Sequence, residues 1–230
     1  MTYSRWDANG NVYLLTQERE FTPERVRQEV DGADGILEVV SADGAAVEIV
    51  VWNPDGSTAE LSGNGTRIAA AWLAERTGEE EIRVRVGTRV VVARILEGGD
   101  VEQEIGPVDV GEREVVAGIE LTPVSVGNPH AVVLGDPQEI RRIGPLLETN
   151  PRFPERTNVQ VAHVDAPGRV RARVWERGAG ETASSGTSAV AVAAATHSDG
   201  DVVVSFPGGD LHVRLSGGHA WLTGPARRIA

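Results

Sequence analysis

The stretch VWNPDGSTAELSGNGTR, residues 51–67, has a counterpart in VWERGAGETASSGTS, residues 174–188. In both stretches a Ser-Gly pair follows the tryptophan by ten residues, at Ser62-Gly63 and at Ser185-Gly186. A strand-like alternating pattern leads to each tryptophan, and an alanine-rich segment without helix breakers follows each Ser-Gly pair. The two stretches therefore predict the same strand, loop and buried helix twice in one chain.

Other signals repeat around these stretches in the same order. A Gly-Asn turn feeds an apolar run at Gly10-Asn11 and again at Gly127-Asn128. Thr22-Pro23 and Asp136-Pro137 each predict a helix start, with a capping residue before a proline. A strand hairpin is expected after each alanine-rich helix, and the four hairpin strands cover residues 82–86, 89–95, 202–206 and 211–215.

This repetition predicts an α/β (α+β) fold made of two pseudo-symmetric lobes. Each lobe is expected to be a mostly antiparallel sheet or barrel wrapped around a central alanine-rich helix, with an active-site cleft between the lobes. The expected lobes are residues 1–112 and 113–230, with polar residues 111–119 as the linker and a final strand that can return to the first lobe. A single core without a site is the simpler alternative, but the repeated loops carry polar residues where packing would require apolar ones.

Composition limits the possible partners. The formal net charge of -12 gives no electrostatic attraction to nucleic acid or to an anionic membrane, so a small molecule is the expected partner. No apolar run approaches the roughly 18 residues that span a bilayer, and no signal peptide is recognisable, so the expected location is the cytoplasm. The chain has no cysteine, and its five histidines show no metal-binding spacing, so no metal site is expected.

The two Ser-Gly loops point to binding of an anion. Each loop lies at a predicted helix start, where backbone N–H groups and the helix dipole favour negative charge. Two such starts facing one substrate carboxylate would also stabilise the charge that develops when a proton leaves the neighbouring carbon, as a cofactor-free amino-acid racemase requires. The alternative is that Ser62 and Ser185 are only helix N-caps, a common role for serine.

Nearly the whole chain resembles the diaminopimelate epimerase family. The resemblance is carried by the strings ANGN, NPDGSTAELSGNGTR, VGNPH, RFPERTNV, ERGAGETASSGTS, FPGGDL and LTGPA. It implies an isomerase that needs no pyridoxal phosphate or other cofactor. Such an enzyme interconverts LL- and meso-diaminopimelate by two-base proton transfer in lysine and cell-wall precursor synthesis. The resemblance also suggests a homodimer.

The resemblance implies roles for particular residues. Ser62 and Ser185 take the acid and base positions, and His130 and Glu176 support them. The implied substrate-binding residues are Asn11, Asn53, Gly63, Asn64, Asn128, Asn158, Glu176, Arg177, Gly186 and Thr187. Taken singly, the asparagines could be turn residues, His130 a core histidine and Glu176 with Arg177 a surface ion pair.

The chain departs from the family at three positions. Ser62 and Ser185 stand where the family carries its two catalytic cysteines, and Val12 stands where it usually carries aspartate. A serine hydroxyl is a far weaker acid than a thiol, whose reference pKa is about 8.5, so proton transfer should be much slower. The serines can reflect engineering, a variant that uses Glu176 or His130 as its base, or a changed reaction such as that of phenazine-type isomerases. A non-catalytic amino-acid-binding protein is a further alternative.

Overall fold

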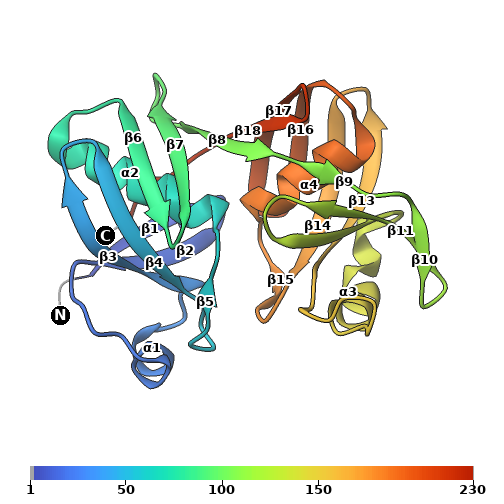
Figure 1. Cartoon of the computed structure of the whole chain (residues 1–230), viewed down its shortest axis with the longest axis horizontal. Helices are drawn as coiled ribbons and strands as arrows, with labels where there is room; N and C mark the ends of the chain where they lie inside the picture. The colour runs from blue at the N-terminus through green and yellow to red at the C-terminus, as the bar shows by residue number, and fades with distance from the viewer. Residues whose placement is uncertain (1–2, 230) are drawn as a thin grey trace. The chain divides into compact units, whose positions relative to one another are not determined.

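Both alanine-rich segments form the expected central helices, α2 at Gly63–Thr77 and α4 at Gly186–Thr196. The computed structural model describes residues 3–229 (Figure 1). Residues 63–73 of α2 and 186–193 of α4 are all buried. The alanine, glycine and serine side chains among these residues allow strands to pack closely against each helix.

The chain forms two compact units. The first contains the residues up to Glu104 together with those from Thr223 onward, and the second contains Ile105–Leu222. The chain therefore enters the second unit within a strand and returns within another, whereas the sequence-based division was at residues 112 and 113.

The first unit is mainly strand. Its elements are β1 Ser4–Ala8, β2 Asn11–Thr16, α1 Pro23–Glu29, β3 Gly35–Asp43, β4 Ala46–Trp52, β5 Thr58–Ala59, α2, β6 Glu81–Val86, β7 Arg89–Ile95, the start of β8 Val101–Pro107, the end of β18 His219–Gly224, and β19 Arg227–Arg228. The second unit holds the rest of β8 and β18 with β9 Asp109–Val110, β10 Glu114–Val116, β11 Ile119–Ser125, β12 Pro129–Leu134, the short 3-10 helix η1 Pro137–Glu139, α3 Ile140–Glu148, β13 Asn158–Ala166, β14 Arg169–Glu176, β15 Gly180–Thr182, α4, β16 Gly200–Phe206 and β17 Gly209–Ser216.

Strand pairing confirms the duplication. In the first unit β2 pairs in parallel with β3, and β4 with β6. The second unit has the same two parallel pairs, β12 with β13 and β14 with β16. The hairpins around them, such as β6 with β7 and β16 with β17, are antiparallel as predicted.

Each central helix is surrounded by the strands of its own unit (Figure 1). Helix α2 contacts β1, β2, β3, β4, β6 and β7, while α4 contacts β11, β12, β13, β14, β16 and β17. A second apolar cluster in each unit packs around the shorter helix, around Val26 of α1 in the first and around Ile140 and Leu147 of α3 in the second. The predicted sheet wrapped around an alanine-rich helix is therefore confirmed for both units.

The two predicted caps form, with different results. The Thr22 hydroxyl accepts from the Arg25 N–H at 3.3 Å and opens α1. The Asp136 carboxylate accepts from the Gln138 N–H at 3.0 Å, but this start first forms the 3-10 turn η1, which then continues as α3.

The linker prediction for residues 111–119 is wrong in part. Residues Glu114–Val116 form strand β10, which pairs with β11 through a tight turn at Ala117 and Gly118. Both turn residues have positive φ, 52° and 77°, which a two-residue hairpin of this kind requires. Alanine seldom adopts that conformation, so the sequence carried little signal for the turn.

Among the described residues, no helix combines the length and apolar character needed to cross a membrane.

The burial of α4 predicts low tolerance to larger side chains. We expect Ala191→Leu to lower the free energy of unfolding by about 1–3 kcal/mol, because Ala191 has no exposed surface and extra carbons would force the neighbouring strands apart. Ala195→Leu is the matched control on the same helix, since Ala195 is only partly buried. Urea unfolding of the two variants measures the difference. Equal losses in both variants would contradict the packing described here.

Candidate functional site

The predicted site residues fall into two sets by unit, named here the first cluster and the second cluster. The first cluster consists of Asn11, Asn53, Ser62, Gly63 and Asn64. The second cluster consists of Asn128, His130, Asn158, Glu176, Arg177, Ser185, Gly186 and Thr187. Each cluster is described here within its own unit.

Ser62 caps α2 through its side chain. Its backbone is extended, with φ -132° and ψ 115°, and its hydroxyl oxygen accepts from the Gly65 N–H at 3.0 Å. A β-carbon at Gly65 would lie 3.3 Å from that hydroxyl and 3.0 Å from Leu37, so glycine gives the cap its room. The simpler alternative for this serine, a structural N-cap, is thus part of its role.

Ser185 precedes α4 with a similar extended backbone but makes no side-chain cap bond. The residue is 4% exposed, and its carbonyl begins the helix by accepting from the Ala189 N–H at 2.9 Å. The position that matches Gly65 is Ser188, whose hydroxyl accepts instead from the Gln160 amide at 2.9 Å. The two serines therefore match in backbone but differ in how their hydroxyls are used.

A buried arginine supports the first cluster. Arg67, in the first turns of α2, has no exposed surface. Its guanidinium donates to the Asn64 Oδ1 at 2.7 Å, the Gly63 carbonyl at 3.1 Å and the Pro225 carbonyl at 3.2 Å. These acceptors are neutral oxygens, and burial lowers the pKa of Arg67 only to about 10, so the side chain stays charged at neutral pH. That charge adds to the helix dipole and favours an anion at this helix start.

Sequence reasoning assigned no role to Arg67, although it directly follows the GNGT string. An arginine on an alanine-rich helix predicted to be buried was the signal that could have identified it.

Two of the three asparagines in the first cluster, Asn11 and Asn53, lie beside turns. Asn53 follows β4, and its amide nitrogen donates to the Ser57 hydroxyl at 3.0 Å while its backbone N–H donates to the Ser57 carbonyl at 2.8 Å. Asn11 is 2% exposed and begins β2 directly after the turn at Asn9 and Gly10, where φ is 54° and 78°. Asn53 is therefore a turn residue, as the simpler interpretation of the sequence expected, and its side chain is only half-buried.

A line of hydrogen-bonded polar groups, buried except for half-buried Asn128, runs through the second cluster. The Gln160 amide donates to Nδ1 of His130 at 3.0 Å, and Nε2 of His130 lies 2.9 Å from the Asn128 Oδ1. The Asn128 amide in turn donates to the Thr187 hydroxyl at 3.4 Å, at the start of α4. Because Nδ1 accepts in this arrangement, the neutral ring carries its proton on Nε2 and donates to Asn128.

His130 therefore acts as a support. It is 1% exposed, and burial lowers its pKa from 6.5 to about 3, with the nearby Arg177 charge contributing. The ring is neutral at physiological pH, and both nitrogens have hydrogen-bond partners. This geometry disfavours the alternative in which His130 removes a substrate proton. Gln160, which sequence reasoning missed, is a buried polar residue between Val159 and Val161 in β13.

Asn158 connects to the turn that carries Glu176 and Arg177. Its Oδ1 accepts from the Arg177 N–H at 3.0 Å, and its amide nitrogen donates to the Pro129 carbonyl at 3.0 Å. Glu176 accepts from the Thr182 hydroxyl at 2.6 Å. Glu176 and Arg177 are half-buried, so their side chains can still reach a ligand.

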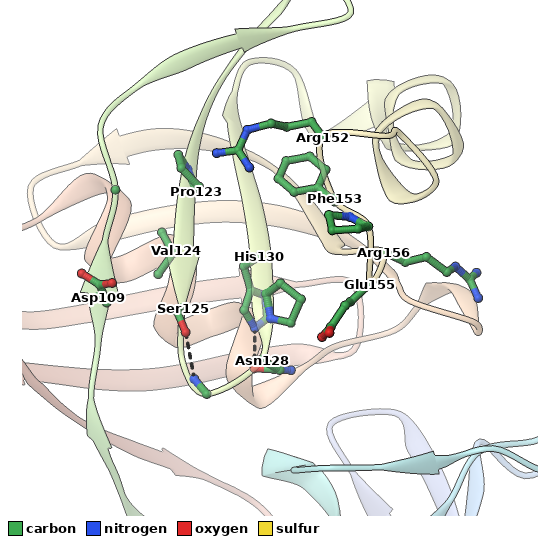
Figure 2. Close-up of a pocket in the computed structure, with 14 residues that line it drawn as sticks. Asp109, Pro123, Val124, Ser125, Asn128, His130, Arg152, Phe153, Glu155 and Arg156 are labelled. Atoms are coloured by element: carbon green, nitrogen blue, oxygen red, sulfur yellow. Dashed lines mark hydrogen bonds between the residues drawn. The ribbon is translucent and has the colours of Figure 1, made fainter.

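A hollow of about 380 Å³ lies beside the second cluster. Asn128 and His130 form part of its wall, and Figure 2 shows Asp109 on one side and Arg152 with Phe153 on the other. Its lining mixes both signs of charge with proline and phenylalanine rings. Within residues 3–229, no group of three His, Asp or Glu side chains is placed to hold a metal ion.

Comparison with known sequences identifies one family, and solved structures show the same fold. The sequence model of the family described as diaminopimelate epimerase matches residues 8–111 and 122–229. A diaminopimelate epimerase from Synechococcus elongatus is 33% identical over 269 aligned positions, which cover 100% of this chain and 96% of that protein. A solved structure described as a predicted epimerase from Pseudomonas aeruginosa superimposes with a TM-score of 0.74 at 16% identity, covering 99% of this chain and 96% of the other.

A phenazine biosynthesis protein of the PhzF family from Bacillus anthracis has the same fold. Its TM-score is 0.73 at 12% identity, with 99% of this chain and 96% of that chain covered.

The buried state of His130 predicts a specific pH dependence of stability. Below pH 6.5 the His130 side chain binds a proton in the unfolded chain, whereas in the folded chain it binds one only near pH 3. The free energy of unfolding therefore falls as the pH falls through this window. Each pH unit in the window contributes about 1.4 kcal/mol. We expect the native protein to lose about 2 kcal/mol more than His130→Asn between pH 6.5 and 5. Urea unfolding at the two pH values measures this, and identical losses would show that His130 is protonated in the folded state.

Proposed function

Because the chain belongs to the diaminopimelate epimerase family, we propose that it binds diaminopimelate and moves the proton on the substrate's α-carbon without a cofactor. The observation that carries this proposal is the matched pair of buried helix starts, each with a serine at the N-cap position. The family relationship suggests the substrate, and the helix starts suggest how its carboxylate is bound and stabilised.

A substrate carboxylate suits the helix starts of α2 and α4. Backbone N–H groups at such starts point toward a bound anion, and the buried Arg67 charge strengthens the first of them. When the α-proton leaves, negative charge spreads onto the carboxylate, and groups already oriented toward it stabilise the transition state more than the ground state.

The proposed reaction uses Ser62 and Ser185 as the two groups on opposite faces of the α-carbon. It therefore requires both hydroxyls to approach the same carbon. The cap bond from the Gly65 N–H to the Ser62 oxygen favours the deprotonated form of that hydroxyl, as does the positive end of α2. Ser185 has no side-chain cap bond, so its hydroxyl can turn toward a ligand.

Serine chemistry makes this reaction slow. A hydroxyl is a far weaker acid than a thiol, and every pKa unit of mismatch costs about 1.4 kcal/mol, or tenfold in rate. We therefore propose that the chain binds substrate well and that cysteine at positions 62 and 185 restores rapid turnover.

An isomerase of the phenazine type, using Glu176 as its base, is the second candidate. The likeness to the PhzF-family structure supports it only through the shared fold. In such an enzyme Glu176→Gln would abolish proton exchange, and Ser185→Ala would not.

Operation as a homodimer, in the cytoplasm and without pyridoxal phosphate, belongs to the same proposal. The resemblance to the epimerase family supports these features. Sedimentation of the purified chain tests the dimer.

Deuterium incorporation tests the function. In heavy water, we expect the chain to introduce deuterium at the α-carbon of LL-diaminopimelate very slowly, and the Ser62→Cys, Ser185→Cys double variant to do so faster by several orders of magnitude. Each single cysteine variant serves as a control, because a two-base reaction needs both groups. If the double variant binds the substrate but exchanges no proton, the proposed chemistry is wrong.

Removal of the buried charge should weaken substrate binding. We expect Arg67→Met to raise the Kd for diaminopimelate at least tenfold, since the variant removes both the positive charge and the hydrogen bond from Arg67 to the Asn64 side chain. Arg67→Lys, which keeps the charge, should lose less. Calorimetric titration compares the three proteins, and equal Kd values for Arg67→Met and the native chain would exclude this role.

A further inference from the structure

We infer that Glu148 is a positioning residue whose carboxylate holds both ends of the turn carrying Glu176 and Arg177. The contacts are structural observations. The importance of the turn for substrate binding rests on the proposed function.

Glu148 contacts the residues on either side of the pair. It is the last residue of α3 and is 6% exposed. Its Oε2 accepts from the Trp175 indole N–H at 2.7 Å, and its Oε1 accepts from the Gly178 backbone N–H at 2.8 Å. One rigid carboxylate thus fixes the positions of residues 175 and 178, and the two residues between them have little freedom left.

The same glutamate also reaches the segment that leads to Asn158. Its carbonyl accepts from the Thr157 N–H at 3.2 Å, and Arg156 forms an ion pair with its carboxylate. Asn158 then accepts from the Arg177 N–H. Three predicted substrate-binding residues, Asn158, Glu176 and Arg177, are therefore each next in the chain to a residue that Glu148 contacts, or hydrogen-bonded to one that is.

Packing of Trp175 against α3 brings the indole to this carboxylate. A β-carbon at Gly144 would lie 2.6 Å from both Cβ and Cγ of Trp175, a distance that side chains do not tolerate. Gly144 and Glu148 are four residues apart and so lie on the same face of the helix. The glycine admits the ring, and the glutamate receives its N–H.

The first unit has a similar contact made from a different element. The Trp52 indole N–H donates at 2.9 Å to Glu38, which is 7% exposed and belongs to strand β3 rather than to a helix. Trp52 directly precedes Asn53, as Trp175 directly precedes Glu176. Both units therefore hold the indole N–H with a buried glutamate, although the glutamate comes from a strand in one unit and from a helix in the other. This indicates that the contact fixes the position of the residue that follows each tryptophan.

A neutral amide cannot replace this carboxylate. Glutamine has one acceptor oxygen, so in Glu148→Gln either the Trp175 or the Gly178 N–H would face an NH2 group, and Arg156 would lose its counter-charge. A buried donor without an acceptor is costly, so the turn should move rather than remain in place.

The test compares four proteins by calorimetry with diaminopimelate and by NMR of the Trp175 indole and the 176–178 amides. We expect Glu148→Gln to raise the Kd at least tenfold. The chemical shifts of those N–H groups should change, and their hydrogen exchange with water should become faster. Trp175→Phe, which removes only the indole donor, should give a smaller change in the same direction. Glu114→Gln is the matched control. It breaks an ion pair to Arg152, which lies in the loop between α3 and β13 together with Arg156, and it does not contact the turn of residues 175–178.

The outcomes separate the two proposals. If the native chain does not bind diaminopimelate, the proposed function fails. The NMR signals still test whether Glu148 holds the turn of residues 175–178. Unchanged 176–178 signals in Glu148→Gln would overturn the inference. If Glu148→Gln does not fold, Trp175→Phe decides, and unchanged 176–178 signals in that variant would overturn the inference.

Discussion

The starts of α2 and α4 are the features on which the rest of the structure depends. A helix start buried in a protein leaves backbone N–H groups that must be satisfied by a cap, by water or by a ligand. In each unit the strands surround the alanine-rich helix, and the buried polar residues of the helix lie in its first turns. The buried polar side chains of each helix therefore gather at the place where the helix begins.

The two starts satisfy this constraint in different ways. At α2 the Ser62 hydroxyl accepts a hydrogen bond from the Gly65 N–H, and the buried Arg67 adds positive charge. At α4 the matching serine leaves its cap position unused, while a line of neutral polar groups from Gln160 through His130 reaches Thr187. Duplication has kept the backbone arrangement, and the side chains have diverged. Such an asymmetry suits a reaction in which one group gives a proton and the other takes one.

Much of the fold follows from local sequence signals. The spacing from tryptophan to Ser-Gly, the two Gly-Asn turns and the capped prolines predicted the duplicated order of elements, because each signal depends on a few neighbouring residues. The hairpin of β10 was missed, since Ala117 adopts a conformation that alanine usually avoids. Gln160 and Glu148 were missed for another reason. Their roles depend on partners far along the chain, as in the contact between Glu148 and Trp175.

The account depends on the proposal that both helix starts bind one substrate carboxylate, and backbone NMR tests this proposal most directly. During titration with LL-diaminopimelate, the amide signals of residues 63–65 and 186–187 should shift together and give the same Kd. A response confined to one helix start, or different Kd values for the two, would contradict the account.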